Sequence, residues 1–260
     1  GGDGMYNVFD KKTNRFLYNE SQFGPLSRLD LVTGERKSIA YRGGNMKRFN
    51  WNAPILVSIH NGDVVYHCGN IVVKSTNRGE SWTESSPELT TNDAAKMPDG
   101  RGGDGNIQYC TITTIDESPL QAGLLWVGTD DGNVWITRND GANWTKLNDK
   151  IPGNPGYWVS RVAASNSAPG TAYVSYTGFR HDDFKPYVFK TTDYGQTWTS
   201  IAANLPAEPI NVVREGAVNP DLLFVGTELN LVERLAGHRA RAVDHQRQVQ
   251  RGALRQLGGR

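Results

Sequence analysis

Three stretches of eight residues decide the fold: STNRGESW (residues 75–82), TRNDGANW (residues 137–144) and TTDYGQTW (residues 191–198). Each has a hydroxyl residue first, Asn or Asp third, glycine fifth and tryptophan eighth, and the tryptophans are 62 and 54 residues apart. An Asn or Asp side chain accepts hydrogen bonds from nearby backbone N–H groups, and glycine supplies the positive φ of a tight turn. The pattern therefore predicts three equivalent hairpin turns of an internal repeat.

Two short apolar strands are predicted before each of these turns. They cover residues 64–66 and 71–73, residues 125–127 and 133–136, and residues 172–174 and 187–189. The order in every copy is strand, turn, strand, octapeptide, strand. The chain has 29 glycines and 7 tryptophans among its 260 residues, which suits many turns and buried aromatic anchors. We therefore expect an all-β protein.

The octapeptides resemble the Asp-box (BNR) repeat found on β-propeller blades. The resemblance covers residues 1 to about 228 and is closest to bacterial repeat proteins described as sortilin-like or as glycosyl hydrolases. Three stretches carry this narrower match: RFNWNAPI (residues 48–55), WVGTDDGNV (residues 126–134) and DDFKPYV (residues 182–188). The resemblance implies four-stranded antiparallel blades around a central axis. It also implies an extracellular or periplasmic location.

The Asp box itself is implied to be a structural turn at the edge of a blade, away from the ligand site. The residues given this structural role are Ser75, Asn77, Gly79, Trp82, Thr137, Asn139, Gly141, Trp144, Thr191, Asp193, Gly195 and Trp198. The most recognisable motif of the chain is therefore not expected to be its functional site.

The predicted fold is a β-propeller fragment of about four to five blades. Blades are expected at about residues 1–40, 41–91, 105–150 and 157–205, with the start of another at 210–228. A propeller closes with typically four to eight complete blades. We therefore expect the remaining blades of a longer chain to be the first partners of this one.

Residues 229–260 differ in composition from the rest. They hold seven arginines, two acidic residues and no lysine or aromatic residue, which gives a charge of 7 − 2 = +5, whereas residues 1–228 carry 21 − 25 = −4. One interpretation is an out-of-frame or disordered tail, since another reading frame permits the missing Asp box. The other is a genuine basic tail, and nucleic acid is expected as a partner only in that case.

No cofactor or metal is expected from the sequence. Cys68 and Cys110 lack metal-ligand spacing and are expected to be free and buried, with a single disulfide left open. His60, His67 and His181 show no ligand spacing, and phosphate-binding and Gly-x-Ser-x-Gly motifs are lacking. No apolar run reaches the roughly 18 residues of a membrane span.

Four acidic residues are candidates for catalysis. Asp3 and Asp104 each lie in a Gly-Gly-Asp-Gly tetrapeptide, and Asp182 and Asp183 lie in a long loop between strands. Loops of this kind often carry function on a rigid scaffold. For each acid, a turn-forming or solvated role is the alternative, and residues 130–132 (DDG) are interpreted first as a hairpin turn.

Aromatic and basic residues outside the Asp boxes are candidates for ligand binding. Aromatic side chains stack on sugars or form a peptide-binding rim, and the alternative for them is blade core. The candidates are Trp51, Tyr157, Trp158, Arg161, Arg180 and His181, with Tyr41 and Phe179 as further aromatics.

Two functions remain open at this point. The first is a non-catalytic, sortilin-like module that binds a protein, peptide or polysaccharide through its loop faces. The alternative is a xyloglucanase-like inverting glycoside hydrolase with two catalytic aspartates. The second requires two carboxyl groups roughly 6.5–9.5 Å apart across an open groove.

Overall fold

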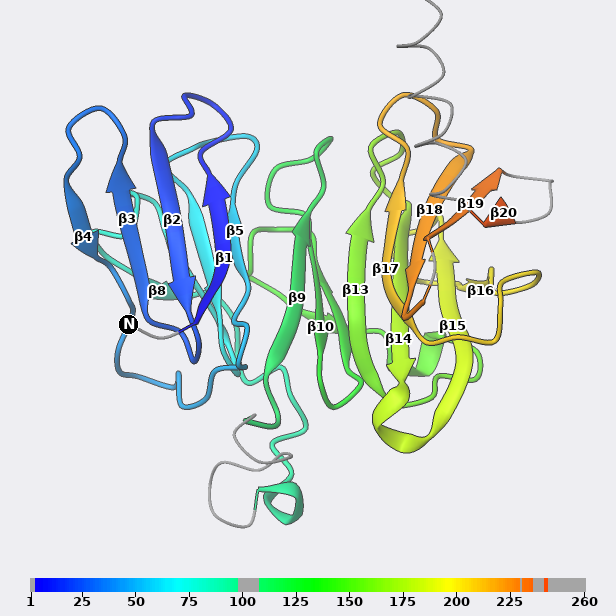
Figure 1. Cartoon of the computed structure of the whole chain (residues 1–260). Helices are drawn as coiled ribbons and strands as arrows, with labels where there is room; N and C mark the ends of the chain where they lie inside the picture. The colour runs from blue at the N-terminus through cyan, green and yellow to red at the C-terminus, as the bar shows by residue number, and fades with distance from the viewer. Residues whose placement is uncertain (1–2, 98–107, 230, 236–240, 243–260) are drawn as a thin grey trace, which may run out of the picture.

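The chain folds into five four-stranded antiparallel sheets, in each of which the strands lie in chain order. The computed structural model describes residues 3–97, 108–229, 231–235 and 241–242. Figure 1 shows the sheets following one another from the blue N-terminal sheet to the orange C-terminal one. The predicted all-β propeller class is confirmed.

The first three sheets carry twelve strands. Sheet 1 has β1 (Gly4–Phe9), β2 (Phe16–Ser21), β3 (Leu26–Asp30) and β4 (Arg36–Ser38); sheet 2 has β5 (Ile55–Val57), β6 (Val65–Cys68), β7 (Val72–Ser75) and β8 (Thr83–Glu84); sheet 3 has β9 (Ile112–Glu117), β10 (Leu125–Thr129), β11 (Val134–Thr137) and β12 (Thr145–Lys146).

The last two sheets carry eight strands. Sheet 4 has β13 (Trp158–Ala164), β14 (Ala172–Gly178), β15 (Asp183–Thr191) and β16 (Thr199–Ser200); sheet 5 has β17 (Ile210–Glu215), β18 (Leu222–Thr227), β19 (Leu231–Leu235) and β20 (Arg241–Ala242). Three short 3₁₀ turns complete the described chain: η1 (Ala94–Lys96), η2 (Asn148–Lys150) and η3 (Phe179–His181).

The first strands of the sheets line the inside of the arrangement. β1 packs on β5, β5 on β9, β9 on β13, and β13 on β17. The buried apolar clusters lie between successive sheets, and one of them joins Trp126 of sheet 3 to Val174 and Trp198 of sheet 4. Each sheet therefore buries its faces against its neighbours, as the blades of a propeller do.

The three Asp boxes form the same turn. The first hydroxyl oxygen accepts the N–H of the glycine four residues later, at 2.8 Å from Ser75 and 3.0 Å from both Thr137 and Thr191. The Oδ1 atom of the third residue accepts the N–H four positions on, at 2.9 Å in all three copies. The residue before each glycine also has a positive φ of 59–60°.

Each Asp-box glycine also packs against the blade before its own. A Cβ atom on Gly79, Gly141 or Gly195 would lie 2.5 Å from Ile39, 2.1 Å from Ser85 or 2.7 Å from Leu147, respectively. These three contact residues each follow directly after the last strand of the preceding sheet. The turns therefore fasten neighbouring blades together as well as closing a hairpin.

The segment after residue 228 contributes to the fifth sheet. β19 pairs antiparallel with β18, and β20 pairs with β19. These strands do not test the reading frame of residues 229–260, so the two interpretations of that tail stay predictions. The rest of the tail lies outside the described residues.

Both cysteines are buried and free, as expected, so they form no disulfide with each other. Within the described residues, no helix is long and apolar enough to cross a membrane.

Candidate functional site

The ring has two different ends, because successive strands of a blade run in opposite directions. At the Asp-box end lie the connections from first to second strand and from third to fourth strand. At the long-loop end lie the other connections, including residues 39–54, 85–97, 108–111 and 147–157 between blades. The predicted candidates Trp51, Tyr157 and Arg180 belong to the long-loop end, in keeping with recognition by loops on a rigid scaffold.

A group of aromatic and basic side chains gathers at the long-loop end of sheet 4. We call it the blade-4 surface and define it as Tyr157, Trp158, Phe179, Arg180, His181, Asp183, Phe184 and Tyr187. The ring of Tyr157 stacks on that of His181, with centroids 4.7 Å apart and planes at 14°. The Arg180 guanidinium lies 5.0 Å from the centroid of the Trp158 ring. The pairing of β13 with β14, in which Trp158 faces Thr177, brings these distant parts of the sequence together.

A cavity of about 340 Å³ opens beside this surface, between sheets 4 and 5. Its polar wall includes Asn211, whose Nδ2 donates to Glu228 Oε2 at 2.7 Å. The complete lining is Trp158, Ser160, Thr177, Phe179, Arg180, Asn211 and Glu228. It combines aromatic faces, a guanidinium, hydroxyls and an amide, which is the mixture typical of a small ligand pocket.

Neither Asp183 of the blade-4 surface nor the neighbouring Asp182 has the environment of a general acid. The Tyr187 hydroxyl donates to Asp183 at 2.6 Å, and the Tyr157 hydroxyl lies 3.4 Å from the same oxygen. These bonds, above all the one from Tyr187, lower the pKa of Asp183, whereas a general acid needs a raised pKa. Asp182 is exposed in a left-handed conformation (φ 53°) that ends η3.

The other predicted candidates lie elsewhere. Trp51 packs edge-on against Phe23, with centroids 5.1 Å apart, on the connection between sheets 1 and 2. Asp3 is exposed before β1, and Asp104 lies outside the described residues. Arg161 lies within β13, outside the blade-4 surface, and its positive charge acts to lower the pKa of Asp116.

Buried polar residues connect the long-loop end to sheet 3 through hydrogen bonds. The sequence alone did not predict these hydrogen bonds. Asp130 accepts the N–H of Thr111 at 2.9 Å and its hydroxyl at 2.5 Å. Asp131 accepts the N–H of Thr91 at 2.6 Å. Burial raises the pKa of Asp130 to about 8. Residues 130–132 thus form the predicted hairpin turn and also anchor the loop that joins sheets 2 and 3.

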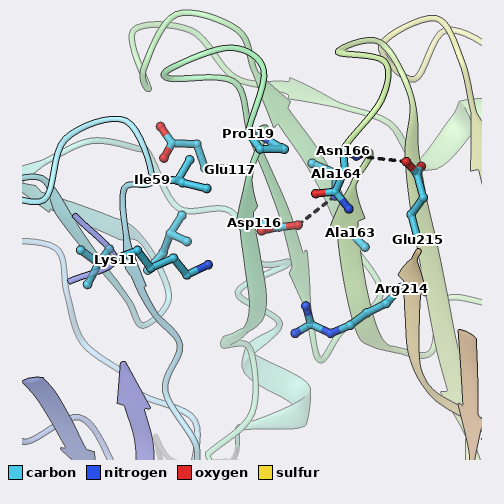
Figure 2. A pocket seen from close by; sticks show the side chains of 12 residues that line it. Lys11, Ile59, Asp116, Glu117, Pro119, Ala163, Ala164, Asn166, Arg214 and Glu215 are labelled. Carbon is cyan, nitrogen blue, oxygen red and sulfur yellow. Dashed lines mark hydrogen bonds between the residues drawn. The ribbon is translucent and has the colours of Figure 1, made fainter. Parts of the chain in front are cut away.

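A second cavity, of about 140 Å³, lies at the Asp-box end, where the first strands of the blades end. Figure 2 shows Asp116 from β9, Arg214 from β17 and Lys11 from the β1–β2 hairpin around it. We call it the axial pocket; the sequence alone does not predict it, because its residues come from five blades. The available signal was positional: Asp116–Glu117 and Arg214–Glu215 occupy the same last two places of β9 and β17.

No family model matches the sequence, and no curated protein matches it. Several solved structures match over most of the described fold. The GH74 xyloglucanase from Xanthomonas campestris aligns with a TM-score of 0.61 and 19% identity, over 89% of this chain and 37% of the enzyme. Virginiamycin B lyase from Staphylococcus aureus aligns with a TM-score of 0.63 and 12% identity, over 93% of this chain and 69% of the lyase.

YCF48 in complex with the D1 peptide aligns with a TM-score of 0.57 and 14% identity, over 95% of this chain and 70% of YCF48. The chain spans only 31% to 37% of the GH74 enzymes it matches. At 12% to 19% identity, these likenesses establish the fold alone.

Proposed function

We propose that this chain is a non-catalytic β-propeller module that binds an extended peptide segment of a protein partner at the blade-4 surface. The observation that carries the proposal is the exposed aromatic and arginine patch beside a cavity of about 340 Å³. Trp, Tyr and Arg are the residues most enriched among the energetic centres of protein interfaces. The sortilin-like resemblance of the sequence and the peptide complex of YCF48 support the same class of ligand.

Two phenylalanines give this surface its apolar centre. Phe179 is 53% exposed and Phe184 is 48% exposed, although their rings contact each other edge-on at 6.2 Å. Adjacent large aromatic side chains left open to water favour a partner that covers them. Arg180 and Asp183 beside them supply charge at the rim, where it orients a partner.

The glycoside hydrolase alternative has weaker support. The GH74 neighbours support it only through the similarity of the fold. The hydroxyls of Tyr187 and Tyr157 lower the pKa of Asp183, which does not suit this carboxyl to act as the general acid of a hydrolase. The proposal also places the protein in an extracellular or periplasmic compartment, as the family resemblance implies. Cell fractionation that finds the native protein in the cytosol would contradict that location.

The test is selection from a displayed random peptide library on the immobilised 260-residue chain. The variant Phe179→Ala/Phe184→Ala should lose the selected peptides by at least tenfold in affinity. Leu120→Ala is the matched control, because Leu120 is 47% exposed but lies at the Asp-box end. Equal binding by the double variant would refute the proposal. Release of reducing sugar from β-glucans, lost in Asp183→Asn or Asp104→Asn, would replace it with the hydrolase.

A further inference from the structure

The axial pocket is a built cavity that is separate from the blade-4 surface. Besides its charged groups it is walled by Leu56, Val57, Ile59, Pro119, Ala163 and Ala164. These apolar side chains come from sheets 2, 3 and 4 and surround one opening. At about 140 Å³, the cavity is smaller than a site for a drug-sized ligand, which takes roughly 300–1,000 Å³.

Two cationic side chains enter the pocket from opposite sides. Figure 2 shows Lys11 reaching in from the β1–β2 hairpin and Arg214 reaching in from β17. Within the part of the chain that the structure describes, neither belongs to an ion pair. The positive charge of Arg214 acts on Asp116 through space and opposes the effect of burial on the pKa of that carboxyl.

Two carboxylates of the pocket accept hydrogen bonds: Glu215 from residues of the neighbouring sheet 4, and Glu117 from its own sheet 3. Glu215 accepts the Tyr173 hydroxyl at 3.2 Å and the Ser167 hydroxyl at 3.0 Å. Glu117 Oε1 accepts the N–H of Gly123 at 3.1 Å. The donors to these two acids are uncharged groups, whereas Lys11 and Arg214 form no direct ion pair among the residues that the structure describes.

Asp116 lines the same pocket as the two cations and is hydrogen-bonded to the neighbouring blade. Its Oδ2 accepts the N–H of Ala164 at 2.9 Å. Burial raises its pKa to about 6 and outweighs the opposing effect of Arg214 and Arg161. The charged groups that face it are Arg161 from β13, Arg214 and Glu215 from β17, Glu117 from its own strand and Lys11 from the β1–β2 hairpin.

We propose that the axial pocket binds a small organic carboxylate, with its carboxylate group held between Lys11 and Arg214 and its carbon body against the apolar wall. The anion gives the two cations a direct ion pair, which neither forms among the described residues. Arginine and carboxylate match in shape as a bidentate pair, and the apolar side chains of the lining offer contacts to the carbon body. This site lies at the opposite end of the ring from the proposed peptide surface and does not depend on it.

Binding at this site is coupled to a proton. A carboxylate ligand beside ionised Asp116 is repelled, whereas neutral Asp116 donates a hydrogen bond to it. Since only the protonated form is competent, apparent affinity scales with its population. With the pKa of Asp116 at about 6, lowering the pH from 7.5 to 5 raises that population by about 30-fold, which is the expected gain in affinity.

Calorimetric titration of the 260-residue chain with D-glucuronate and lactate tests the site, because both acids stay ionised between pH 5 and 7.5. At least one should bind, and more tightly at pH 5. Arg214→Gln and Lys11→Gln should each weaken binding at least tenfold, and Asp116→Asn should abolish its pH dependence. The control is Lys185→Gln, an exposed cation at the long-loop end, which should bind like the unchanged chain.

Several results would overturn the proposal. They are absence of binding by both acids, equal binding of neutral glucose, or full affinity in Arg214→Gln. Equal binding of inorganic sulfate would show that charge alone is recognised and would reject the organic ligand. Phe179→Ala/Phe184→Ala should leave carboxylate binding unchanged, so that failure of the peptide proposal and failure of this one are distinguishable.

Discussion

Replacement of His67 by phenylalanine should stabilise the protein, and more so at acidic pH. His67 lies in β6 and is fully buried. Its ring stacks on Phe49, with centroids 5.2 Å apart. Neither ring nitrogen has a hydrogen-bond partner in the described structure. Burial lowers the pKa of His67 to about 4, so the folded protein holds a neutral imidazole in apolar surroundings.

The size of the effect follows from the two pKa values of this histidine. Between pH 6.5 and 4 the unfolded chain binds a proton that the folded chain does not, so His67 costs stability as the pH falls. For a folded pKa of about 4 and an unfolded pKa of about 6.5, this cost is about 2 kcal/mol at pH 5. The unpaired nitrogens add about 1–3 kcal/mol at every pH.

Urea denaturation of the wild-type chain and of His67→Phe at pH 8 and pH 5 measures this effect. Subtracting the two curves cancels the other titrating groups, such as Glu20, whose pKa burial raises to about 7. The variant should be about 1–3 kcal/mol more stable at pH 8, and the gap should grow by about 2 kcal/mol at pH 5. A gap that does not change with pH would show that the imidazole finds a partner or accepts a proton in the folded state.

Two further predictions use the same denaturation assay. Asp130→Asn should show the opposite trend. Because the pKa of Asp130 is raised, the folded chain keeps a proton that the unfolded chain loses above pH 4, so the wild type should lose stability relative to this variant as the pH rises to 8. A difference in stability that stays constant with pH would contradict the burial argument. Gly195→Ala should cost about 1–3 kcal/mol, because its φ is +82° and the new Cβ would lie 2.7 Å from Leu147. Gly153→Ala is the matched control, with φ of +62° and open space around its Cβ, and equal losses in the two variants would rule out the contact between blades.

The parts of the fold that the sequence predicted are those built by local bonds. In the third Asp box, Asp193 accepts the N–H and hydroxyl of Thr197 at 2.9 and 2.6 Å, only four residues away. Such a turn requires the same residue types at the same spacing in each copy, so it can be recognised in the sequence. The predicted strands follow from the same repeat. In the first blade, which lacks the octapeptide, Asp10 and Asp30 accept backbone N–H groups two residues later in the β1–β2 and β3–β4 hairpins.

The candidate site was predicted only in part, since its chemistry depends on distant residues. The sequence singled out Trp158 and Arg180 separately, and the pairing of β13 with β14 made them one surface. It also singled out Asp183, but the pKa of that carboxyl is lowered by the hydroxyl of Tyr187 and also by that of Tyr157, which is 26 residues away. A single sequence without the register of the strands carries no sign of such a neighbour.

The two ends of the ring are under different physical constraints, and this explains where recognition can vary. At the Asp-box end, glycines 79, 141 and 195 each touch the preceding blade too closely for a Cβ atom, so the turns there tolerate little change. The axial pocket avoids that constraint because it is built from the ends of the first strands, where Asp116 and Arg214 occupy equivalent places. At the long-loop end, the described parts of the connections between blades (residues 39–54, 85–97, 108–111 and 147–157) differ in sequence from one blade to the next. A change of ligand is therefore easier to achieve at the blade-4 surface than anywhere on the Asp-box turns.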